Sequence, residues 1–346
     1  MSHNNQFAAV AEPSIAVLGA GAWGTALACV LAHKHAEIML WANEAETVAA
    51  VNQRHENTPF LAGVPLPENI KATAALEDLA DADIILMVVP AQFARPVLTA
   101  LSALNDKAML VLCAKGIERD SLQLMSDVAR AHFAPQRLAV LSGPSFAADV
   151  ARGLPTAVTL ACADVETGAW LATHIGTAHF RTYLSDDITG AEIGGAIKNV
   201  LAIACGIVAG KGLGESARAA LTARGFVEMS RLGAALGAKP ETLSGLSGLG
   251  DLILTCASDT SRNFSLGRAL GEGDKAETVL GARNSVSEGA MSAAAVAALA
   301  DKHGVDMPIC RAVNSILSCD AGVDEAINDL LARPVAREND EMIKGA

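Results

Sequence analysis

The stretch SIAVLGAGAWGTALACVLAH, residues 14–33, decides the fold of this chain. Residues 14–18 form a short apolar run that is typical of a buried strand, and TALACVLAH has the pattern of a helix. Gly19, Gly21 and Gly24 stand between the two in a GxGxxG arrangement. Between a strand and a helix this motif predicts a turn that binds the pyrophosphate of a dinucleotide, and a glycine-rich turn without a ligand is the alternative.

The end of the second expected strand, 37–41, bears on which dinucleotide would bind. An acidic side chain at this place hydrogen-bonds the ribose of NAD, and a basic one accommodates the 2′-phosphate of NADP. Here the neutral Asn43 is followed by Glu44 and Glu46. These residues leave the choice between NAD and NADP open.

Three further apolar runs, 83–90, 109–116 and 138–145, alternate with helical stretches such as 119–133. Strands that alternate with helices along the chain pack as a parallel sheet with helices on its faces. The sequence therefore predicts an α/β, Rossmann-like N-terminal domain with a mainly parallel sheet.

After about residue 190 the sequence shows only helical patterns. GAEIGGAIKNVLAIACGIVAG, residues 190–210, predicts one long buried helix. Further helical patterns follow at 215–237, 265–271, 286–303, 308–319 and 323–332. We therefore expect a dinucleotide-binding Rossmann domain over 1–190 and an all-α domain for substrate binding and catalysis over 191–346.

The composition excludes several classes of function. The 346 residues carry a formal net charge of −12, and no basic stripe marks a nucleic-acid-binding surface. The seven cysteines form no CxxC pair, the eight histidines have no zinc-site spacing, and the first residues, MSHNNQ, are polar. We therefore expect reduced thiols, no metal, and a cytoplasmic location. No apolar run of about 18 residues is free of polar interruption, which argues against insertion into a membrane.

Polar and turn residues follow the expected strands, where ligands of open α/β sheets bind. Lys115 lies at the end of the run 109–116, and Gly143, Ser145 and Ala147 lie at the end of the run 138–145 or just after it. Lys115 could bind an anionic group of a substrate. The alternative is a solvated loop lysine, which is the commoner role of lysine.

Lys198 lies in the middle of the long apolar helix. Its neighbours on the same helix face are Gly194, Gly195, Leu201 and Ala202, and none of them is a carboxylate. We expect the small neighbours to leave room for a ligand, and burial to make the ammonium lose its proton more readily. This suits a general acid/base that acts on a carbonyl oxygen, and a structural lysine is the alternative.

Two more groups of residues complete the expected site. Asp251 and Thr255 are four residues apart, so they share a helix face, and Asp251 could pair with Lys198 or cap a helix. Ser261, Arg262 and Asn263 precede a helical pattern. Ser261 can cap that helix and Arg262 can hold two phosphate oxygens, although a solvated surface arginine is the alternative.

The chain resembles the bacterial NAD(P)-dependent glycerol-3-phosphate dehydrogenase family from the first strand to about residue 332. Eight segments carry the resemblance in the right order, which are GAGAWGTALA, CAKGI, SGPSFA, GGAIKNVLAIACG, RGFVEMSRLGAALGA, GLGDLILTC, SRN and VSEG. The resemblance implies reduction of dihydroxyacetone phosphate to sn-glycerol 3-phosphate, the precursor of phospholipids, with NADH or NADPH as reductant.

The resemblance also implies a role for individual residues. Lys198 matches the proton donor and acceptor of the family, and Asn199 and Thr255 match supporting positions. The positions that match substrate contacts are Lys115, Gly143, Ser145, Lys198, Asp251, Ser261, Arg262 and Asn263. Those that match coenzyme contacts are Gly19, Gly21, Ala22, Trp23, Gly24, Asn43, Lys115, Ala147, Arg262, Val286 and Glu288. Asn43 departs from the basic residue that many members carry there, and this departure puts a preference for NADP in doubt.

Two other functions and a homodimeric assembly are also compatible with the sequence. A β-hydroxyacid or imine-reducing enzyme could share the two-domain plan and a helix-borne lysine. A dinucleotide sensor without catalysis would keep the glycine turn but would need neither Lys198 nor Asp251. The apolar helices of the second domain would also permit a homodimer.

Overall fold

An eight-stranded sheet organises the first half of the chain in the computed structural model, which describes residues 12–281, 287–318 and 320–334. Its strands are β1 (Ile15–Leu18), β2 (Ile38–Trp41), β3 (Ile70–Thr73), β4 (Ile84–Met87), β5 (Met109–Leu112), β6 (Leu138–Ser142), β7 (Thr156–Cys162) and β8 (Phe180–Ser185). They lie in the order β3-β2-β1-β4-β5-β6-β7-β8, and each neighbouring pair is parallel except β6 with β7. The mainly parallel α/β sheet that the sequence predicts is confirmed.

The register of the central strands brings their carboxyl ends to one edge of the sheet. Leu18 of β1 lies opposite Trp41 of β2 and Met87 of β4, and Met87 lies opposite Leu112 of β5. The glycine turn after β1 and the polar segments after β2 and β5 therefore leave the sheet at the same edge. This edge is where open α/β sheets bind their ligands.

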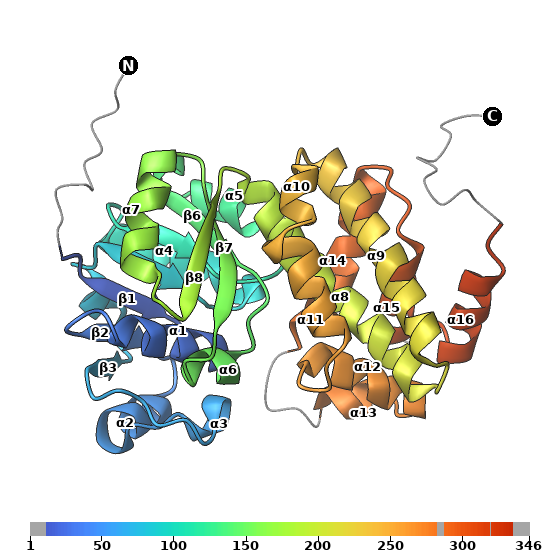
Figure 1. Ribbon diagram of the computed structural model, residues 1–346, viewed down its shortest axis with the longest axis horizontal. Helices are drawn as coiled ribbons and strands as arrows, with labels where there is room; N and C mark the ends of the chain where they lie inside the picture. The colour runs from blue at the N-terminus through green and yellow to red at the C-terminus, as the bar shows by residue number, and fades with distance from the viewer. Residues whose placement is uncertain (1–11, 282–286, 319, 335–346) are drawn as a thin grey trace.

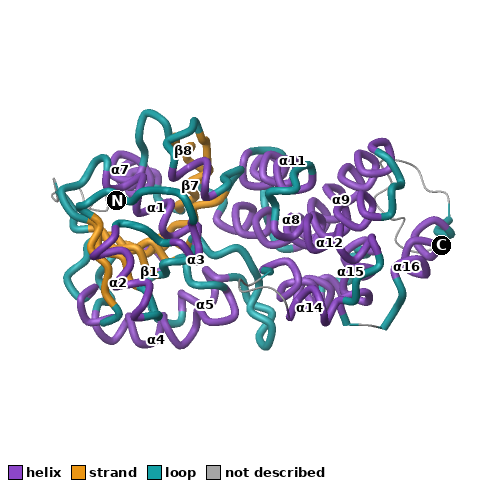
Figure 2. The backbone as a smooth tube through the Cα atoms, turned by 90° about the horizontal axis from the view of Figure 1, so that it is seen from below, coloured by secondary structure: helices purple, strands orange, loops and turns teal. Residues whose placement is uncertain are grey.

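Helices cover both faces of the sheet (Figure 2). One face packs against α1 (Ala22–Ala32), α6 (Ala147–Ala151) and α7 (Val165–Ile175). The other face packs against α4 (Ala94–Leu104) and α5 (Met125–Arg130). The connections contain α2 (Ala45–Arg54), α3 (Thr58–Leu61) and the short turns η1 (Leu76–Leu79), η2 (Ala91–Phe93) and η3 (Pro135–Arg137). Strands buried on both faces are continuously apolar, as β1, β4, β5 and β6 are.

The second half of the chain is a set of helices around α8 (Ile188–Gly210), beside the sheet half (Figure 1). These are α9 (Glu215–Ala235), α10 (Pro240–Leu243), the π-turn η4 (Leu246–Gly250), α11 (Asp251–Cys256), α12 (Arg262–Glu272), α13 (Ala276–Gly281), α14 (Glu288–Lys302), α15 (Pro308–Leu317) and α16 (Val323–Leu331). Because α8 is apolar on all sides, its neighbours surround it and form one core with it. This all-helical second half agrees with the sequence.

Gly206 of α8 and Gly267 of α12 let these two helices cross in close contact. A Cβ on Gly206 would lie 2.0 Å from the carbonyl oxygen of Phe264, and a Cβ on Gly267 would lie 1.9 Å from that of Ile203. No side chain fits between the two backbones. The crossing therefore fixes the start of α12, which carries Arg262, against the helix that carries the central lysine.

By length and composition α8 could also cross a membrane, and among the described residues it is the one helix that meets this criterion. However, 89% of its most apolar window is buried inside the protein. A helix that is covered by its own chain in this way is the core helix of a folded domain.

The structure corrects several expected elements. The stretch 119–133 is not one helix, because Leu122 has a φ of +56° and only α5, from Met125 to Arg130, is helical there. The sequence reasoning also missed β3, β7 and β8, so the sheet has an antiparallel neighbour that was not expected. The sheet ends at Ser185 and α8 begins at Ile188. The division of the chain into 1–190 and 191–346 stays a prediction.

The cysteines of the described residues form no disulfide. Within the described residues six cysteines are free and buried, namely Cys29, Cys113, Cys162, Cys205, Cys256 and Cys310. Across the same residues, no group of three or more histidine, cysteine, aspartate or glutamate side chains could hold a metal ion.

Candidate active site

The glycine turn between β1 and α1 has the geometry that a pyrophosphate requires. Gly19 has a φ of +122°, which side chains of L-residues rarely adopt, and a Cβ on Gly24 would lie 1.8 Å from the carbonyl oxygen of Gly19. Nothing lies within 4 Å of a Cβ built on Gly21, so the space in front of this residue is open. The first N–H groups of α1 point out of the turn and favour an anion. The turn therefore fits the phosphates of a dinucleotide.

Asn57 supports this turn from behind, and the sequence reasoning missed it. Its buried amide donates to the carbonyl oxygen of Ala20 and to Oγ1 of Thr25, both at 2.8 Å. Because Ala20 lies inside the GxGxxG motif, these bonds fix the conformation of the loop. Only the fold could reveal this contact, because Asn57 is far from the motif in sequence.

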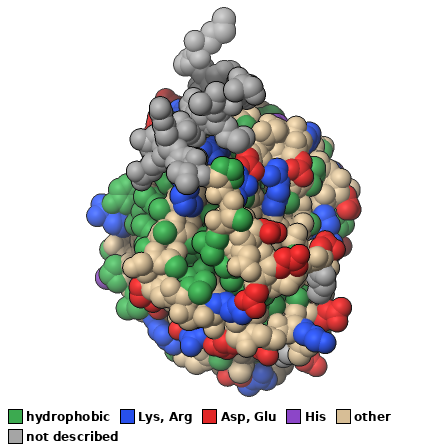
Figure 3. Space-filling model, turned by 90° about the vertical axis from the view of Figure 1, so that its right-hand side faces the viewer, with side chains coloured by type: hydrophobic (Ala, Val, Ile, Leu, Met, Phe, Trp, Pro, Cys, Tyr) green, Lys and Arg blue, Asp and Glu red, His purple; other side chains and the backbone are tan. Residues whose placement is uncertain are grey.

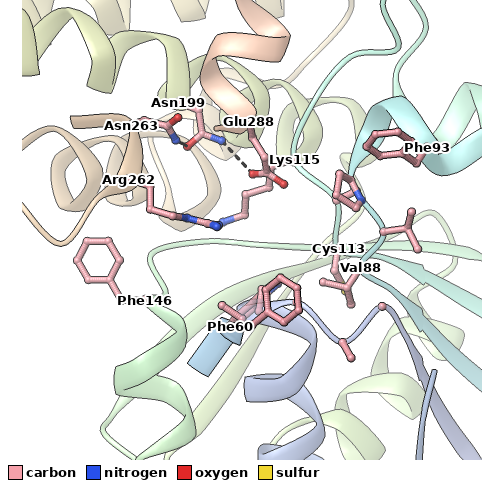
Figure 4. Close-up of a pocket in the computed structure, with 18 of the residues that line it drawn as sticks. Phe60, Val88, Phe93, Cys113, Lys115, Phe146, Asn199, Arg262, Asn263 and Glu288 are labelled. Atoms are coloured by element: carbon pink, nitrogen blue, oxygen red, sulfur yellow. Dashed lines mark hydrogen bonds between the residues drawn. The ribbon is translucent and has the colours of Figure 1, made fainter. Parts of the chain in front are cut away.

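A cavity of about 620 Å³ opens over the turn and reaches the helical half of the molecule. The residues that the sequence singled out and that line it are Gly19, Gly21, Ala22, Trp23, Asn43, Lys115, Lys198, Asn199, Thr255, Ser261, Arg262, Asn263 and Glu288. Figure 4 shows Arg262 reaching toward Lys115 from the helical half, with Phe60 and Val88 on the side of the sheet. One cavity thus unites residues from both halves of the chain.

Other expected site residues lie outside this lining, namely Gly24, Gly143, Ser145, Ala147 and Asp251. Gly143 and Ser145 act locally, because the carbonyl oxygen of Gly143 accepts bonds from Nζ of Lys115 at 3.1 Å and from Oγ of Ser145 at 3.0 Å. Val286 lies outside the described residues.

Asp251 binds both lysines of the site. Its Oδ1 accepts a hydrogen bond from Nζ of Lys198 at 3.0 Å, and its Oδ2 accepts one from Nζ of Lys115 at 2.6 Å. Thr255, one turn further along α11, accepts a bond from Nζ of Lys198 at 3.0 Å and donates to the backbone oxygen of Asp251 at 2.6 Å. The pairing expected for Asp251 and Lys198 is therefore present, and Asp251 does not cap a helix, because it lies inside α11.

Burial and charge oppose each other in this cluster. Burial lowers the pKa of Lys198, and the neighbouring carboxylate of Asp251 only partly offsets that effect. Burial alone would raise the pKa of Asp251, but the charges of Lys115 and Lys198 hold that pKa below its usual value. Asp251 is therefore ionised, and Lys198 carries a proton that it releases more readily than a lysine in water.

The small residues beside Lys198 have a different purpose from the one expected. A Cβ on Gly195 would lie 3.2 Å from Cγ of Lys115, so this glycine makes room for the second lysine. A Cβ on Gly194 would lie 2.3 Å from the carbonyl oxygen of Ser247, so that glycine admits the turn η4. The prediction that these neighbours open space for a ligand was wrong, because protein atoms fill the space.

A chain of amides holds the other side of the cavity. Asn263 donates to Oδ1 of Asn199 at 2.9 Å, and Asn199 donates to the carboxyl group of Glu288 at 3.3 Å (Figure 4). Oδ1 of Asn263 accepts the backbone N–H of Gly289 at 3.1 Å. Burial raises the pKa of Glu288, although Arg262 and the two lysines act against this shift. The side chain of Asn263 thus connects the start of α12 to the start of α14.

Arg262 is the first residue of α12, and its side chain is exposed. Ser261 caps this helix, because its Oγ accepts the backbone N–H of Phe264 at 3.2 Å. The cap that the sequence predicts is confirmed. A guanidinium beside a capped helix N-terminus offers several N–H donors to a phosphate, and both face the cavity here.

Comparisons with known proteins agree along nearly the whole chain. Residues 14–168 match the family model described as NAD-dependent glycerol-3-phosphate dehydrogenase N-terminus, and residues 187–328 match the one described as its C-terminus. The chain belongs to the NAD-dependent glycerol-3-phosphate dehydrogenase family. A relative in Parvibaculum lavamentivorans named glycerol-3-phosphate dehydrogenase [NAD(P)+] is 60% identical over 95% of this chain and 99% of its own.

Further relatives of the family give the same result. The protein of that name in Caulobacter vibrioides is 55% identical over 94% of this chain and 98% of its own length. The crystal structure of glycerol-3-phosphate dehydrogenase from Coxiella burnetii superimposes with a TM-score of 0.89 at 41% identity, covering 93% of this chain and 99% of that one. The fold and family expected from the eight sequence segments are therefore confirmed.

Several cavity residues of this family member escaped the sequence reasoning. Those with aromatic side chains are Trp41, Phe60, Phe93 and Phe146. Phe93 lines the cavity and is 52% exposed. Aromatic residues make up only 3% of the chain, and no local pattern marked these four as cavity residues.

Proposed function

We propose that this chain is an NAD(P)-dependent oxidoreductase that interconverts dihydroxyacetone phosphate and sn-glycerol 3-phosphate. One observation carries the proposal. The proton-bearing Nζ of Lys198 is held by Asp251 and Thr255 in a cavity that also contains the glycine turn and Arg262. A proton donor, a dinucleotide turn and a phosphate-binding group are the three parts that this reaction needs.

Each part has a defined task. A reduced nicotinamide bound at the glycine turn would supply the hydride that C2 of the ketone accepts. Lys198 donates its proton to the carbonyl oxygen as negative charge develops there, and it takes the proton back in the oxidation direction. Asp251 holds the amine in place, and Lys115 adds a second positive charge beside it. Gly19, Gly21 and the start of α1 would hold the pyrophosphate.

The phosphate of the substrate lies, in this proposal, at the start of α12. Arg262 would bind two of its oxygens, and the backbone N–H groups beyond the Ser261 cap would bind the third. The substrate would then lie between this phosphate site and Lys198. Asn199 and Glu288 would line the coenzyme side.

The deciding experiment is a spectrophotometric assay of the purified chain with NADH and NADPH. We expect coenzyme oxidation with dihydroxyacetone phosphate, a product of the sn-3 configuration, and little turnover with dihydroxyacetone or a 2-oxo acid. Turnover of a 2-oxo acid or imine instead would identify a related reductase. Binding of coenzyme without turnover of any of these compounds would identify a sensor.

We also propose that the enzyme acts in the cytoplasm and supplies phospholipid synthesis, as expected for this product. A homodimer is part of the proposal. Figure 3 views the end of the molecule that carries α16, and hydrophobic side chains gather on part of that face. Leu331, the last residue of α16, is 78% exposed, and Leu213 is 48% exposed. Light scattering of the full chain, compared with Leu331→Ser, tests whether two copies associate.

A further inference from the structure

The end of β2 forms one wall of the cavity. Asn43 and Glu44 follow β2 directly, both are exposed, and both line the cavity. The neighbouring strand β1 carries the glycine turn. In folds of this kind, the residue at the end of the second strand contacts the 2′ position of that ribose.

Glu44 has its carboxylate available for this contact. It is the residue before α2, with an extended backbone (φ −93°, ψ 118°), and its side chain does not cap the helix. Glu46 follows in the first helical turn. Two carboxylates therefore stand where the start of α2 would otherwise attract an anion.

The positive charges of the cavity lie elsewhere. Within the described lining they belong to Lys115, Lys198 and Arg262. Both lysines are bound to Asp251. Arg262 points toward Lys115 (Figure 4), and its charge acts on Glu288.

Resting on the function proposed above, we infer that this chain selects NADH over NADPH, and that Glu44 with Asn43 makes the selection. The carboxylate of Glu44 accepts a hydrogen bond from the ribose 2′-hydroxyl of NADH. A 2′-phosphate carries about −1.5 to −2 charges at neutral pH and would be repelled by the same carboxylate. Asn43 adds an amide and no positive charge.

Calorimetric titration of the full chain separates this inference from activity. We expect NADH to bind at least about tenfold more tightly than NADPH, since repulsion of a doubly charged group costs that much even in water. The fragments 5′-AMP and adenosine 2′,5′-bisphosphate should show the same order. The ratio should shrink as salt is raised, because salt screens exposed charges.

Variants locate the effect. Asn43→Arg should shift the binding ratio toward NADPH by about tenfold, since a guanidinium pairs well with a phosphate. Glu44→Gln should also move it toward NADPH. Glu46→Gln removes the same charge two residues away, outside the cavity lining, and should leave the ratio within about twofold.

Two results would overturn the inference. One is NADPH binding as tightly as NADH, or more tightly, in the unaltered chain. The other is an equal shift of the binding ratio in Glu44→Gln and Glu46→Gln. That result would mean that the overall negative charge of this region, and not a contact with Glu44, sets the ratio. Both results would leave the proposed reaction intact, because the reduction of dihydroxyacetone phosphate is measured separately.

Discussion

Nζ of Lys198 lies 3.0 Å from Oδ1 of Asp251, although 53 positions separate the two residues in the chain. The other oxygen of the same carboxylate binds Lys115, which lies 136 positions away from Asp251. One buried carboxylate thus holds an amine from the long helix and an amine from the edge of the sheet. The two halves of the molecule are joined by an ion triad at the place where the chemistry is proposed.

Lys198→Met should lower turnover by about 10² or more, because the forming alkoxide loses its proton donor. Coenzyme affinity should remain close to that of the unaltered chain, since the glycine turn is untouched. Steady-state kinetics and calorimetric titration measure the two effects. Lys302→Met, at an exposed position of α14, is the matched control. Turnover near the normal value in Lys198→Met would contradict the proposed role.

Asp251→Asn should move the basic limb of the pH profile for ketone reduction to lower pH. The carboxylate raises the pKa of Lys198. Without that charge the amine loses its proton at lower pH, and the donor form disappears earlier as pH rises. The buried Lys198 and the partly buried Lys115 would also be left without a counter-charge, so the free energy of unfolding should fall by about 3 kcal/mol.

The pH dependence of kcat and urea titrations check both effects of Asp251→Asn. Asp259→Asn, at an exposed partner of Arg268, is the control that changes the same charge at the surface. An unchanged basic limb in Asp251→Asn would show that Lys198 is not the group that titrates.

Gly21→Ala and Gly24→Ala should fail in different ways. Gly21 has an ordinary φ of −67° and open space in front of it, so Gly21→Ala should fold but bind coenzyme about tenfold more weakly. Gly24→Ala would press its Cβ against a backbone carbonyl and should lose about 2 kcal/mol of stability. Thermal unfolding and titration with NADH distinguish the two. Equal loss of stability in both variants would argue against an open phosphate site at Gly21.

Arg262→Met should raise KM for dihydroxyacetone phosphate by about tenfold or more, because a charge-assisted pair with phosphate is lost. The weak reaction with unphosphorylated dihydroxyacetone should change little. Arg268→Met removes an arginine from the same helix, where Arg268 pairs with Asp259 and Glu272, and serves as the control. If KM rises equally for the phosphorylated and the unphosphorylated substrate in Arg262→Met, the residue does not hold the phosphate.

Glu192 should make the protein less stable as pH rises from about 4.5 to about 7. Burial raises the pKa of Glu192 to about 7 from 4.5, although hydrogen bonds from Ser126 oppose the shift. The folded state therefore binds more protons than the unfolded state across this window. The contribution of Glu192 to the free energy of unfolding is fully present below pH 4.5 and is lost above pH 7. The loss is on the order of 3 kcal/mol.

Glu192→Gln should flatten that decline in urea titrations at several pH values, because glutamine imitates the protonated acid toward Ser126. Part of the decline should remain, since burial raises the pKa of Glu228 to about 7 as well. A slope equal to that of the unaltered chain would show that Glu192 does not titrate in this range.

The amino-acid sequence alone determined the local parts of this protein. The strand and helix around the glycine turn, the long apolar helix and the Ser261 cap depend on residues a few positions apart, so periodicity and turn chemistry predict them. The short stretch after residue 119 escaped prediction, because the left-handed backbone of Leu122 does not follow from its own side chain. Strands β7 and β8 were missed for a similar reason, since pairing with other strands of the sheet defines them.

Only the tertiary structure decided how the site is assembled. The sequence suggested a pair between Lys198 and Asp251, but not that Lys115 shares the same carboxylate, nor that Gly195 makes room for Lys115. It did not show that Asn57 fixes the glycine turn or that Glu44 faces the coenzyme cavity. Such contacts join segments that are remote along the chain, and their geometry is set by the packing of sheet and helices, which no local pattern contains.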